Sequence, residues 1–174
     1  ILKAKKNLRL IDGTNYTSEE LLKFVSFNQN IMIQSEDLNL FSTKNFKIVS
    51  KRKPTSKQLK DLIFAFNVCR YVKSNAIVLA SNETTVGIGS GQPSRLDSCQ
   101  IAINKMKKFN LQNDNLVAAS DAFFPFVDGI EKLVQSGVRA VVQPSGSIRD
   151  KEIINFANET DTVLVFSKTR HFRH

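Results

Sequence analysis

The amino-acid sequence predicts an α/β fold, in which strands and helices alternate along the chain. After residue 54, short apolar runs typical of buried strands alternate with segments whose apolar residues recur at helical spacing. No internal repeat, low-complexity tract or Gly/Ser linker divides the 174 residues, so a single unit is expected. Strands that alternate with helices indicate a layered arrangement in which helices cover a sheet.

The first 50 residues alternate short apolar runs with polar turns. Residues 17–25 (TSEELLKFV) predict a helix, because Thr17 or Ser18 can cap its N-terminus and acidic residues follow in its first turn. Two further apolar runs lie at residues 31–34 (IMIQ) and 46–49 (FKIV).

The clearest helix begins at Pro54. Thr55 and Gln58 form a capping-box pair at its start, and its pattern continues to about Lys73. Its apolar stripe follows helical spacing and comprises Leu59, Leu62, Ile63, Phe66 and Cys69.

A hairpin and further alternating elements follow this helix. Residues 76–80 (AIVLA) are expected to form a buried strand, residues 81–85 a turn, and residues 86–88 the second half of a hairpin. Pro93 suits the first turn of the next helix, whose apolar positions are Leu96, Cys99, Ile103 and Met106. The remaining expected elements are strands at 116–120, 140–143 and 162–166, and helices at 129–136, closed by Gly137, and 150–158.

Polar or Gly-rich segments that follow the predicted strands indicate a ligand site. In folds of this class, ligands bind beyond the carboxyl ends of the strands. In the PSGS turn, backbone N–H groups can point at a ligand, and the terminal segment directly follows an apolar strand, which predicts a docked end. The four segments are residues 89–95 (GSGQPSR), 120–126 (SDAFFPF), 144–150 (PSGSIRD) and 167–174 (SKTRHFRH).

The glycine-rich stretch does not match the common phosphate-binding loops. Gly87, Gly89 and Gly91 have G-x-G-x-G spacing and residues 109–113 contain no acidic residue, so the dinucleotide-binding pattern fails. A Walker loop fails because no Gly-Lys-Ser/Thr follows. Two interpretations stay open: an anion site at a helix N-terminus that carries Arg95, or a turn that serves geometry alone.

The phenylalanines of DAFFPF also allow two interpretations. They can pack onto the core, or they can form an aromatic wall for a flat ring ligand such as a pterin or purine. The two histidines, His171 and His174, lie at the end of the chain, and no catalytic triad, carboxylate pair or metal cluster is evident. The residues alone therefore support an α/β anion-binding domain.

The composition narrows the classes of partner. A net charge of +9 favours an anionic ligand, but the basic residues are spread along the chain, so nucleic acid and a small phosphorylated or polycarboxylate ligand both stay open. No apolar run approaches the length of a membrane span, and no signal peptide is evident.

Cys69 and Cys99 lack zinc spacing and lie on apolar helix faces, which predicts reduced core residues in a cytoplasmic protein. Because the chain begins with Ile1, a fragment or processed product is expected.

Six motifs occur in order: KRKPT, VKSNAIVLA, GIGSGQPSRLDS, ASDAFFPFVDGIE, VVQPSGSIRD and the terminal RHFRH. They resemble the AICAR (5-aminoimidazole-4-carboxamide ribonucleotide) transformylase family of bifunctional purine-biosynthesis enzymes, in its bacterial form. The resemblance is strong over residues 45–174, and it implies that residues 1–174 are a C-terminal subdomain of the transformylase domain. It further implies a cytidine-deaminase-like layered α/β/α fold with a mixed sheet, and a homodimer that binds neither membrane nor nucleic acid. The implied reaction transfers a formyl group from 10-formyltetrahydrofolate to the amine of AICAR.

The resemblance also implies roles for single residues. Asn75 matches a residue that contacts AICAR and supports formyl transfer, and Arg95 matches an AICAR-binding arginine. Asp121 and the backbone near Ser74 match a potassium site of some members, and no transition metal is implied. The positions that match folate-lining residues are Leu96, Phe123, Ser147, Ile148 and Arg170.

The chain departs from the family at several points. The family's catalytic Lys-His pair has no counterpart here and the cyclohydrolase domain is absent, so the isolated chain is expected to be inactive. Val127 stands where many members carry arginine, and residues 28–30 replace a Gly-rich stretch, whereas His171 and Arg173 agree with the bacterial pattern. The alternative hypothesis is a non-catalytic basic α/β module that binds phosphometabolites or nucleic acid.

Overall fold

The chain forms two compact units, Ile1–Leu38 and Asn39–His174, where the sequence indicated one. This computed structural model describes residues 9, 12–14, 22–37, 40–109, 111 and 115–173. No Gly/Ser-rich or Pro-rich composition marks the boundary near residue 38, which is why the sequence did not reveal it.

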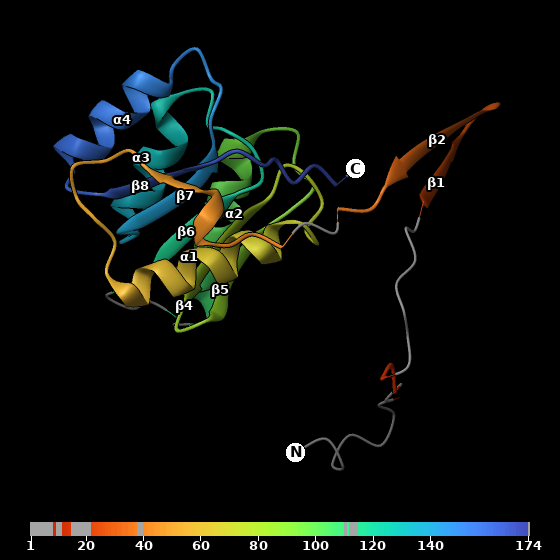
Figure 1. Ribbon diagram of the computed structural model, residues 1–174, viewed down its shortest axis with the longest axis horizontal. Helices are drawn as coiled ribbons and strands as arrows, with labels where there is room; N and C mark the ends of the chain where they lie inside the picture. The colour runs from red at the N-terminus through yellow and green to blue at the C-terminus, as the bar shows by residue number, and fades with distance from the viewer. Residues whose placement is uncertain are drawn as a thin grey trace. The chain divides into compact units, whose positions relative to one another are not determined.

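The first unit contains an antiparallel hairpin of β1 (Leu22–Phe27) and β2 (Asn30–Ser35) (Figure 1). Phe24 pairs with Ile33 across the two strands. Asn28 in the connecting turn has a φ of +52°, a conformation that asparagine tolerates better than most residues and that suits tight hairpin turns.

The helix predicted over residues 17–25 is wrong where the structure describes it. Residues 22–25 lie in β1, and residues 17–21 fall outside the described part of the chain. The helix signal came from capping residues, whereas the apolar residues of this segment pair with the next apolar run. Side-chain pairing between strands outweighs a weak local helix propensity.

The second unit is built on a six-stranded mixed sheet with the strand order β3-β8-β7-β6-β4-β5. Strands β6, β7 and β8 are parallel, β4 is antiparallel to β5 and β6, and β3 is antiparallel to β8. The predicted α/β class with a mixed sheet is therefore confirmed, while the cytidine-deaminase-like assignment stays a prediction. The strands are β3 (Phe46–Ile48), β4 (Ile77–Ser81), β5 (Thr84–Gly89), β6 (Val117–Ser120), β7 (Ala140–Pro144) and β8 (Val163–Ser167).

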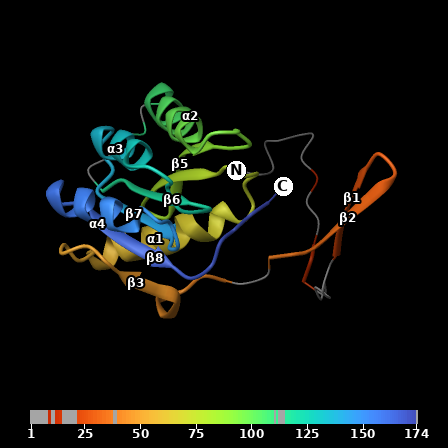
Figure 2. The ribbon, with the colours of Figure 1, turned by 90° about the horizontal axis from the view of Figure 1, so that it is seen from above.

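Helices cover both faces of this sheet (Figures 1 and 2). The helix α1 packs on one face through Leu62 and Phe66, while α2, α3 and α4 pack on the other. This is the layered α/β/α arrangement that the sequence predicted. The helices are α1 (Ser56–Cys69), α2 (Arg95–Lys108), α3 (Val127–Gln135) and α4 (Asp150–Glu159).

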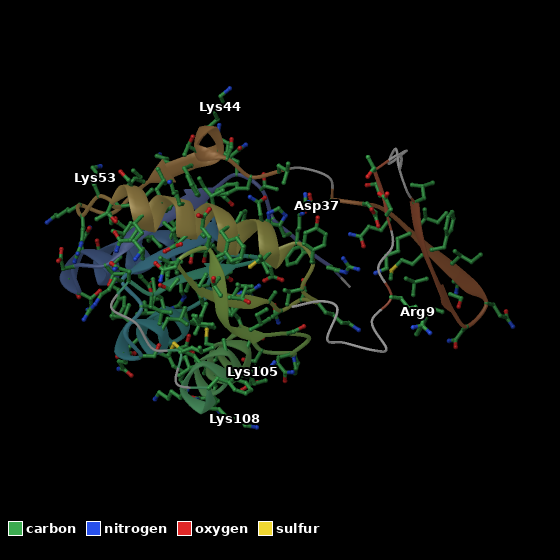
Figure 3. All side chains as sticks on the ribbon, turned by 90° about the horizontal axis from the view of Figure 1, so that it is seen from below. Arg9, Asp37, Lys44, Lys53, Lys105 and Lys108 are labelled. Atoms are coloured by element: carbon green, nitrogen blue, oxygen red, sulfur yellow. The ribbon has the colours of Figure 1, made fainter. Side chains whose placement is uncertain are left out.

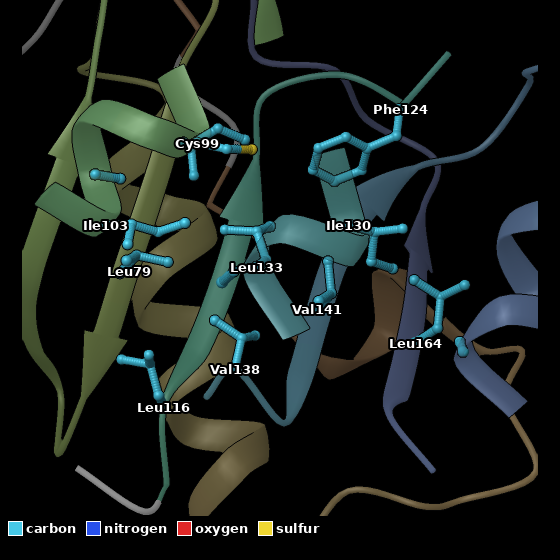
Figure 4. Close-up of a cluster of buried hydrophobic side chains, with 14 of the residues drawn as sticks. Leu79, Cys99, Ile103, Leu116, Phe124, Ile130, Leu133, Val138, Val141 and Leu164 are labelled. Atoms are coloured by element: carbon cyan, nitrogen blue, oxygen red, sulfur yellow. The ribbon is translucent and has the colours of Figure 1, made fainter. Parts of the chain in front are cut away.

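Residues of the central strands alternate between two apolar cores. In β4, Val78 packs into the core beneath α1, and Leu79 packs into the core beneath α2 and α3. Figure 4 shows the second core, with Leu116 and Phe124 at its opposite ends. Because both faces of these strands are buried, the strands read in the sequence as continuous apolar runs rather than as alternating ones.

Two predicted signals at helix ends are confirmed, whereas Pro93, expected in a first turn, lies before the N-cap residue Ser94 of α2. The backbone N–H of Gln58 donates to Thr55 Oγ1 (3.1 Å), and the backbone N–H of Thr55 donates to Gln58 Oε1 (3.0 Å). Gly137, just beyond α3, has a φ of +101°, which a residue with a side chain adopts only with strain. The helix α1 ends at Cys69, before the predicted end near Lys73.

Both cysteines are free and buried in the cores, as predicted. Burial raises the pKa of the Cys99 thiol to about 12 and raises the pKa of the Cys69 thiol well above its ordinary value. Both groups are therefore protonated at neutral pH, and neither is an activated nucleophile. Within the described residues, no helix combines the length and apolarity needed to cross a membrane.

Candidate functional site

The sheet brings the four predicted ligand-side segments to one edge. Ile77 at the start of β4 pairs with both Gly89 and Ser120, the last residues of β5 and β6. Since β6, β7 and β8 are parallel, the carboxyl ends of β5, β6, β7 and β8 all lie at the edge where β4 begins. This edge carries residues 89–95, 120–126, 144–150 and 167–173, as predicted.

The glycines of the Gly-rich stretch allow α2 to lie directly on β5. A Cβ atom at Gly87 would lie 2.2 Å from the carbonyl oxygen of Ala102, and one at Gly89 would lie 1.9 Å from that of Ser98. Gly91 turns the chain with a φ of +66°. The geometric interpretation is thus correct for these glycines, and their effect is to fix the first turn of α2 at the ligand edge.

Arg95, the first residue of α2, lies in a buried polar network. Its Nε donates to Ser120 Oγ (2.9 Å), and its Nη2 forms an ion pair with Asp121 Oδ1 (2.8 Å). Ser74 Oγ donates to the other carboxylate oxygen of Asp121 at 2.6 Å. The side chains of Arg95 and Asp121 are 10% and 0% exposed, so each charge depends on the other for compensation.

The terminal segment is docked against this network, as predicted. Ser74 and Arg173 are joined by two hydrogen bonds, from Ser74 N to Arg173 O (2.9 Å) and from Arg173 N to Ser74 Oγ (3.1 Å). The backbone N–H of His171 donates to the carbonyl oxygen of Asp121 (3.0 Å). The buried His171 ring packs on Phe66, with 4.4 Å between ring centroids. The segment therefore belongs to the folded unit.

Asn75 joins the start of β4 to the Gly-rich turn. Its Nδ2 donates to the carbonyl oxygens of Gln92 (2.9 Å) and Pro93 (3.1 Å), and its own carbonyl oxygen accepts from Ser98 Oγ (2.8 Å). Two carbonyl acceptors require the NH₂ group on that side, so the amide orientation follows from the hydrogen bonds. The side-chain oxygen Oδ1 is the part of the amide left for a ligand.

A pocket of about 320 Å³ opens at this point, and Asn75, Arg95 and Leu96 line it together. These are three of the residues that the resemblance implied, and they come from two separate segments. Phe126, one of the phenylalanines of DAFFPF, and Asp128, which the sequence reasoning did not single out, line the pocket as well. The pocket combines an amide, a guanidinium and a carboxylate with apolar side chains, the usual makeup of a small-molecule site.

The core-packing interpretation of the loop DAFFPF is confirmed for Phe124, while the aromatic wall stays a prediction. Phe124 is buried in the core beneath α3 and also lines the pocket. Phe123 is half-buried and Phe126 is exposed, so both can present a ring to a ligand. The sequence identified the loop as aromatic, but which ring faces which side depends on the backbone path after β6.

The remaining folate candidates do not line this pocket, but two of them, Phe123 and Arg170, contact each other. The guanidinium carbon of Arg170 lies 4.9 Å from the centroid of the Phe123 ring. A Cβ atom at Gly146 would lie 3.3 Å from Arg170 Nη2, so the loop that carries Ser147 and Ile148 passes close to this pair. Ile148 is completely exposed (103%).

The prediction that the PSGS turn offers free backbone N–H groups is wrong for two of its residues. The N–H groups of Gly146 and Ser147 donate to the two carboxylate oxygens of Asp150, at 2.8 and 3.2 Å. Asp150 lies in the first turn of α4, where a carboxylate is favourable and can cap such donors. The loop is thus held by its own chain.

The residues implied for potassium, Asp121 and the backbone near Ser74, lie in the Arg95 network, and the potassium site stays a prediction. Both oxygens of Asp121 already accept hydrogen bonds, from Arg95 and Ser74, and the guanidinium supplies the positive charge. Among the described residues, no three His, Cys, Asp or Glu side chains are grouped to hold a metal.

A second pocket, of about 510 Å³, lies where β3 begins and β7 and β8 end. Lys44, Lys47 and Lys168 line it, together with the apolar Phe166. None of the residues implied for AICAR or folate lines this pocket.

Comparison with known proteins gives concordant matches. Residues 1–105 match the family model described as "AICARFT/IMPCHase bienzyme". The chain is 44% identical over 171 residues to "Bifunctional purine biosynthesis protein PurH" of Persephonella marina, covering 98% of this chain and 33% of that protein. It is 47% identical over 176 residues to the protein of the same name from Buchnera aphidicola subsp. Schizaphis graminum, covering 100% of this chain and 34% of that protein. The chain thus spans about a third of the length of these curated relatives.

Proposed function

Because this chain belongs to the AICARFT/IMPCHase bienzyme family, we propose that it supplies the AICAR-binding and folate-binding residues of an AICAR transformylase acting in purine biosynthesis. We infer that it forms the C-terminal subdomain of that activity. The observation that carries the proposal is the pocket lined jointly by Asn75, Arg95 and Leu96.

The proposed reaction transfers a formyl group from 10-formyltetrahydrofolate to the amine of AICAR. The amine nitrogen bonds to the formyl carbon, and the bond between that carbon and N10 of the folate breaks. The proton lost by the amine balances the proton gained by N10. The amine is a weak nucleophile because its lone pair is delocalised into the ring and carboxamide, so holding it in line with the formyl carbon contributes much of the rate.

Asn75 is suited to hold AICAR rather than the formyl oxygen. Its Nδ2 hydrogens are taken by Gln92 and Pro93, so the group that faces a ligand is the acceptor Oδ1. An acceptor binds the N–H groups of the amine or carboxamide, whereas the formyl oxygen requires a donor. We therefore assign Asn75 the orientation of the attacking amine.

Arg95 is suited to bind an anionic or carbonyl group of AICAR. Its Nε and Nη2 are held by Ser120 and Asp121, which leaves Nη1 as a donor in the pocket wall. The ion pair fixes the guanidinium before the ligand arrives, so little rotamer entropy is lost on binding.

The distribution of charge favours this proposal over the nucleic-acid alternative. Within the second unit, Lys44 and Lys53 lie on one side, and Lys105 and Lys108 lie on the opposite side (Figure 3). A nucleic-acid surface gathers its basic residues on one face. A small anionic ligand in a pocket requires no such gathering.

Formyl transfer by the complete enzyme tests the proposal. Asn75→Ala removes the acceptor, and we expect kcat/KM for AICAR to fall by roughly a hundredfold, the size typical of losing one positioned polar group. Asn104→Ala is the matched control, because Asn104 is an exposed amide on α2 outside the pocket, and it should retain activity. Equal activity of the two variants would refute the role of Asn75.

The proposal includes a homodimer of the complete enzyme. The β1–β2 hairpin is consistent with an assembly, because its large apolar side chains are exposed on both faces of the two strands. Exposed apolar patches of this kind mark interaction surfaces, and an isolated hairpin gains little stability of its own. Sedimentation equilibrium should give twice the mass of one chain of the complete enzyme, and a monomer would contradict the proposal.

A further inference from the structure

Two arginines stack on phenylalanines of the DAFFPF loop, one from each of two neighbouring segments. Arg170, from the terminal segment, lies over Phe123 at 4.9 Å, and Arg149, from the loop between β7 and α4, lies over Phe126 at 4.8 Å. The first pair consists of residues implied for folate. The second pair was not implied, and its phenylalanine lines the pocket.

The Arg149–Phe126 pair joins an exposed arginine to a residue that lines the pocket. Phe126 is 51% exposed, and the side chain of Arg149 is 48% exposed. Stacking restricts the planar guanidinium while leaving its edge N–H groups available to a ligand. The backbone N–H of Arg149 donates to Ser147 Oγ (3.1 Å), which helps to fix the loop that presents it.

The present partner of Arg149 can be exchanged at low cost. Its Nη1 lies 3.3 Å from Glu152 Oε2. This exposed ion pair joins the N-cap residue Arg149 to the first turn of α4. Such pairs contribute little to stability, so a ligand carboxylate can replace Glu152. Arg95, the arginine inside the pocket, is by contrast tied to the buried Asp121.

We infer that Arg149 binds the carboxylates of the glutamyl portion of the folate co-substrate while the pterin ring lies against Phe126, beside the AICAR held by Asn75 and Arg95. This inference rests on the proposed function. A folate is a flat ring joined to a flexible dicarboxylate, so a ring held against Phe126 brings its anionic end out past the rim. A guanidinium fixed on the outer wall matches a carboxylate in charge and in bidentate geometry. Val127, next to Phe126, supplies no charge there.

The experiment compares two ligands that differ only in the glutamyl portion. Binding of folic acid and of pteroic acid, which lacks glutamate, is measured by titration calorimetry with the full chain and with the complete enzyme. Arg149→Ala should weaken folic acid roughly tenfold, as expected for a partly exposed charge-assisted pair, and change pteroic acid by less than about twofold. Arg149→Lys should restore part of the loss, because it keeps the charge without the fork.

Lys151→Ala is the matched control, since Lys151 is an exposed cation of the first turn of α4, two residues beyond Arg149. It should leave both affinities unchanged. In the complete enzyme, Arg149→Ala should raise KM for 10-formyltetrahydrofolate with kcat unchanged. An equal loss of affinity for both ligands, or no loss for either, would overturn the role of Arg149 but leave the proposed function intact. A wild-type enzyme that binds neither ligand would overturn the proposed function itself.

Discussion

Gly89→Ala should destabilise the second unit by about 3 kcal/mol or more, because the new methyl group would overlap the backbone of α2. A Cβ atom there would lie 1.9 Å from the carbonyl oxygen and 2.6 Å from the carbonyl carbon of Ser98. Neither atom can move without displacing the helix from the strand. Urea unfolding followed by circular dichroism measures the change in the free energy of unfolding.

Gly91→Ala provides the control for the Gly89 variant. Gly91 has a φ of +66°, but a Cβ atom there would meet only the flexible side chain of Lys73 at 3.7 Å. Its cost should be about 1 kcal/mol, from backbone conformation alone. If the two variants were equally stable, the close packing of α2 on β5 would be refuted.

Arg95→Ala should lower the free energy of unfolding by about 3–5 kcal/mol, because it leaves the carboxylate of Asp121 buried without its cation. The Asp121 side chain is 0% exposed, so in the native structure it depends on the guanidinium rather than on water for compensation of its charge. Adding Asp121→Asn to this variant should recover part of the stability, since it removes the unpaired charge. In the complete enzyme, AICAR affinity should stay lost in both variants, because the donor in the pocket is gone.

Arg52→Ala is the matched control for Arg95. Arg52 pairs with Asp161 at 2.6 Å, a shorter contact than that of Arg95, but both side chains are exposed (40% and 77%). Its loss should cost less than about 1 kcal/mol and leave AICAR binding unchanged. A cost for Arg95→Ala as small as that for Arg52→Ala would show that the network contributes little to stability.

The sequence predicted elements best where local and long-range signals agree. The capping box at Thr55 and Gln58 and the apolar stripe of α1 both point to a helix, and the helix is there. Residues 17–25 carry capping signals but no apolar stripe at helical spacing. The described part of this segment, residues 22–25, forms a strand that pairs with β2 instead of a helix. Pairing partners lie elsewhere in the chain, so local propensity cannot supply them.

The candidate site was predictable as a set of segments but not as a set of side chains. Alternating strands and helices placed four segments at one edge, and the sheet order bears this out. Which side chains turn into the pocket depends on loop conformation, so the sequence indicated the phenylalanines of DAFFPF as a group and did not indicate Asp128. The hydrogen bonds from the PSGS N–H groups to Asp150 could not be predicted for the same reason, because they depend on how the loop meets the first turn of α4.

The network around Asp121 has a consequence for the order in which the second unit folds. Its hydrogen bonds join residues 25 to 99 positions apart, as from Arg95 to Ser120 and from Arg173 to Ser74. Closing such long loops costs entropy that only the finished sheet repays, so we expect these bonds to form after the β4–β5 hairpin and the helices. Contacts made late are absent from the folding transition state, and weakening them accelerates unfolding while leaving the folding rate nearly unchanged. The ligand edge therefore sets the lifetime of the native state more than the speed with which it is reached.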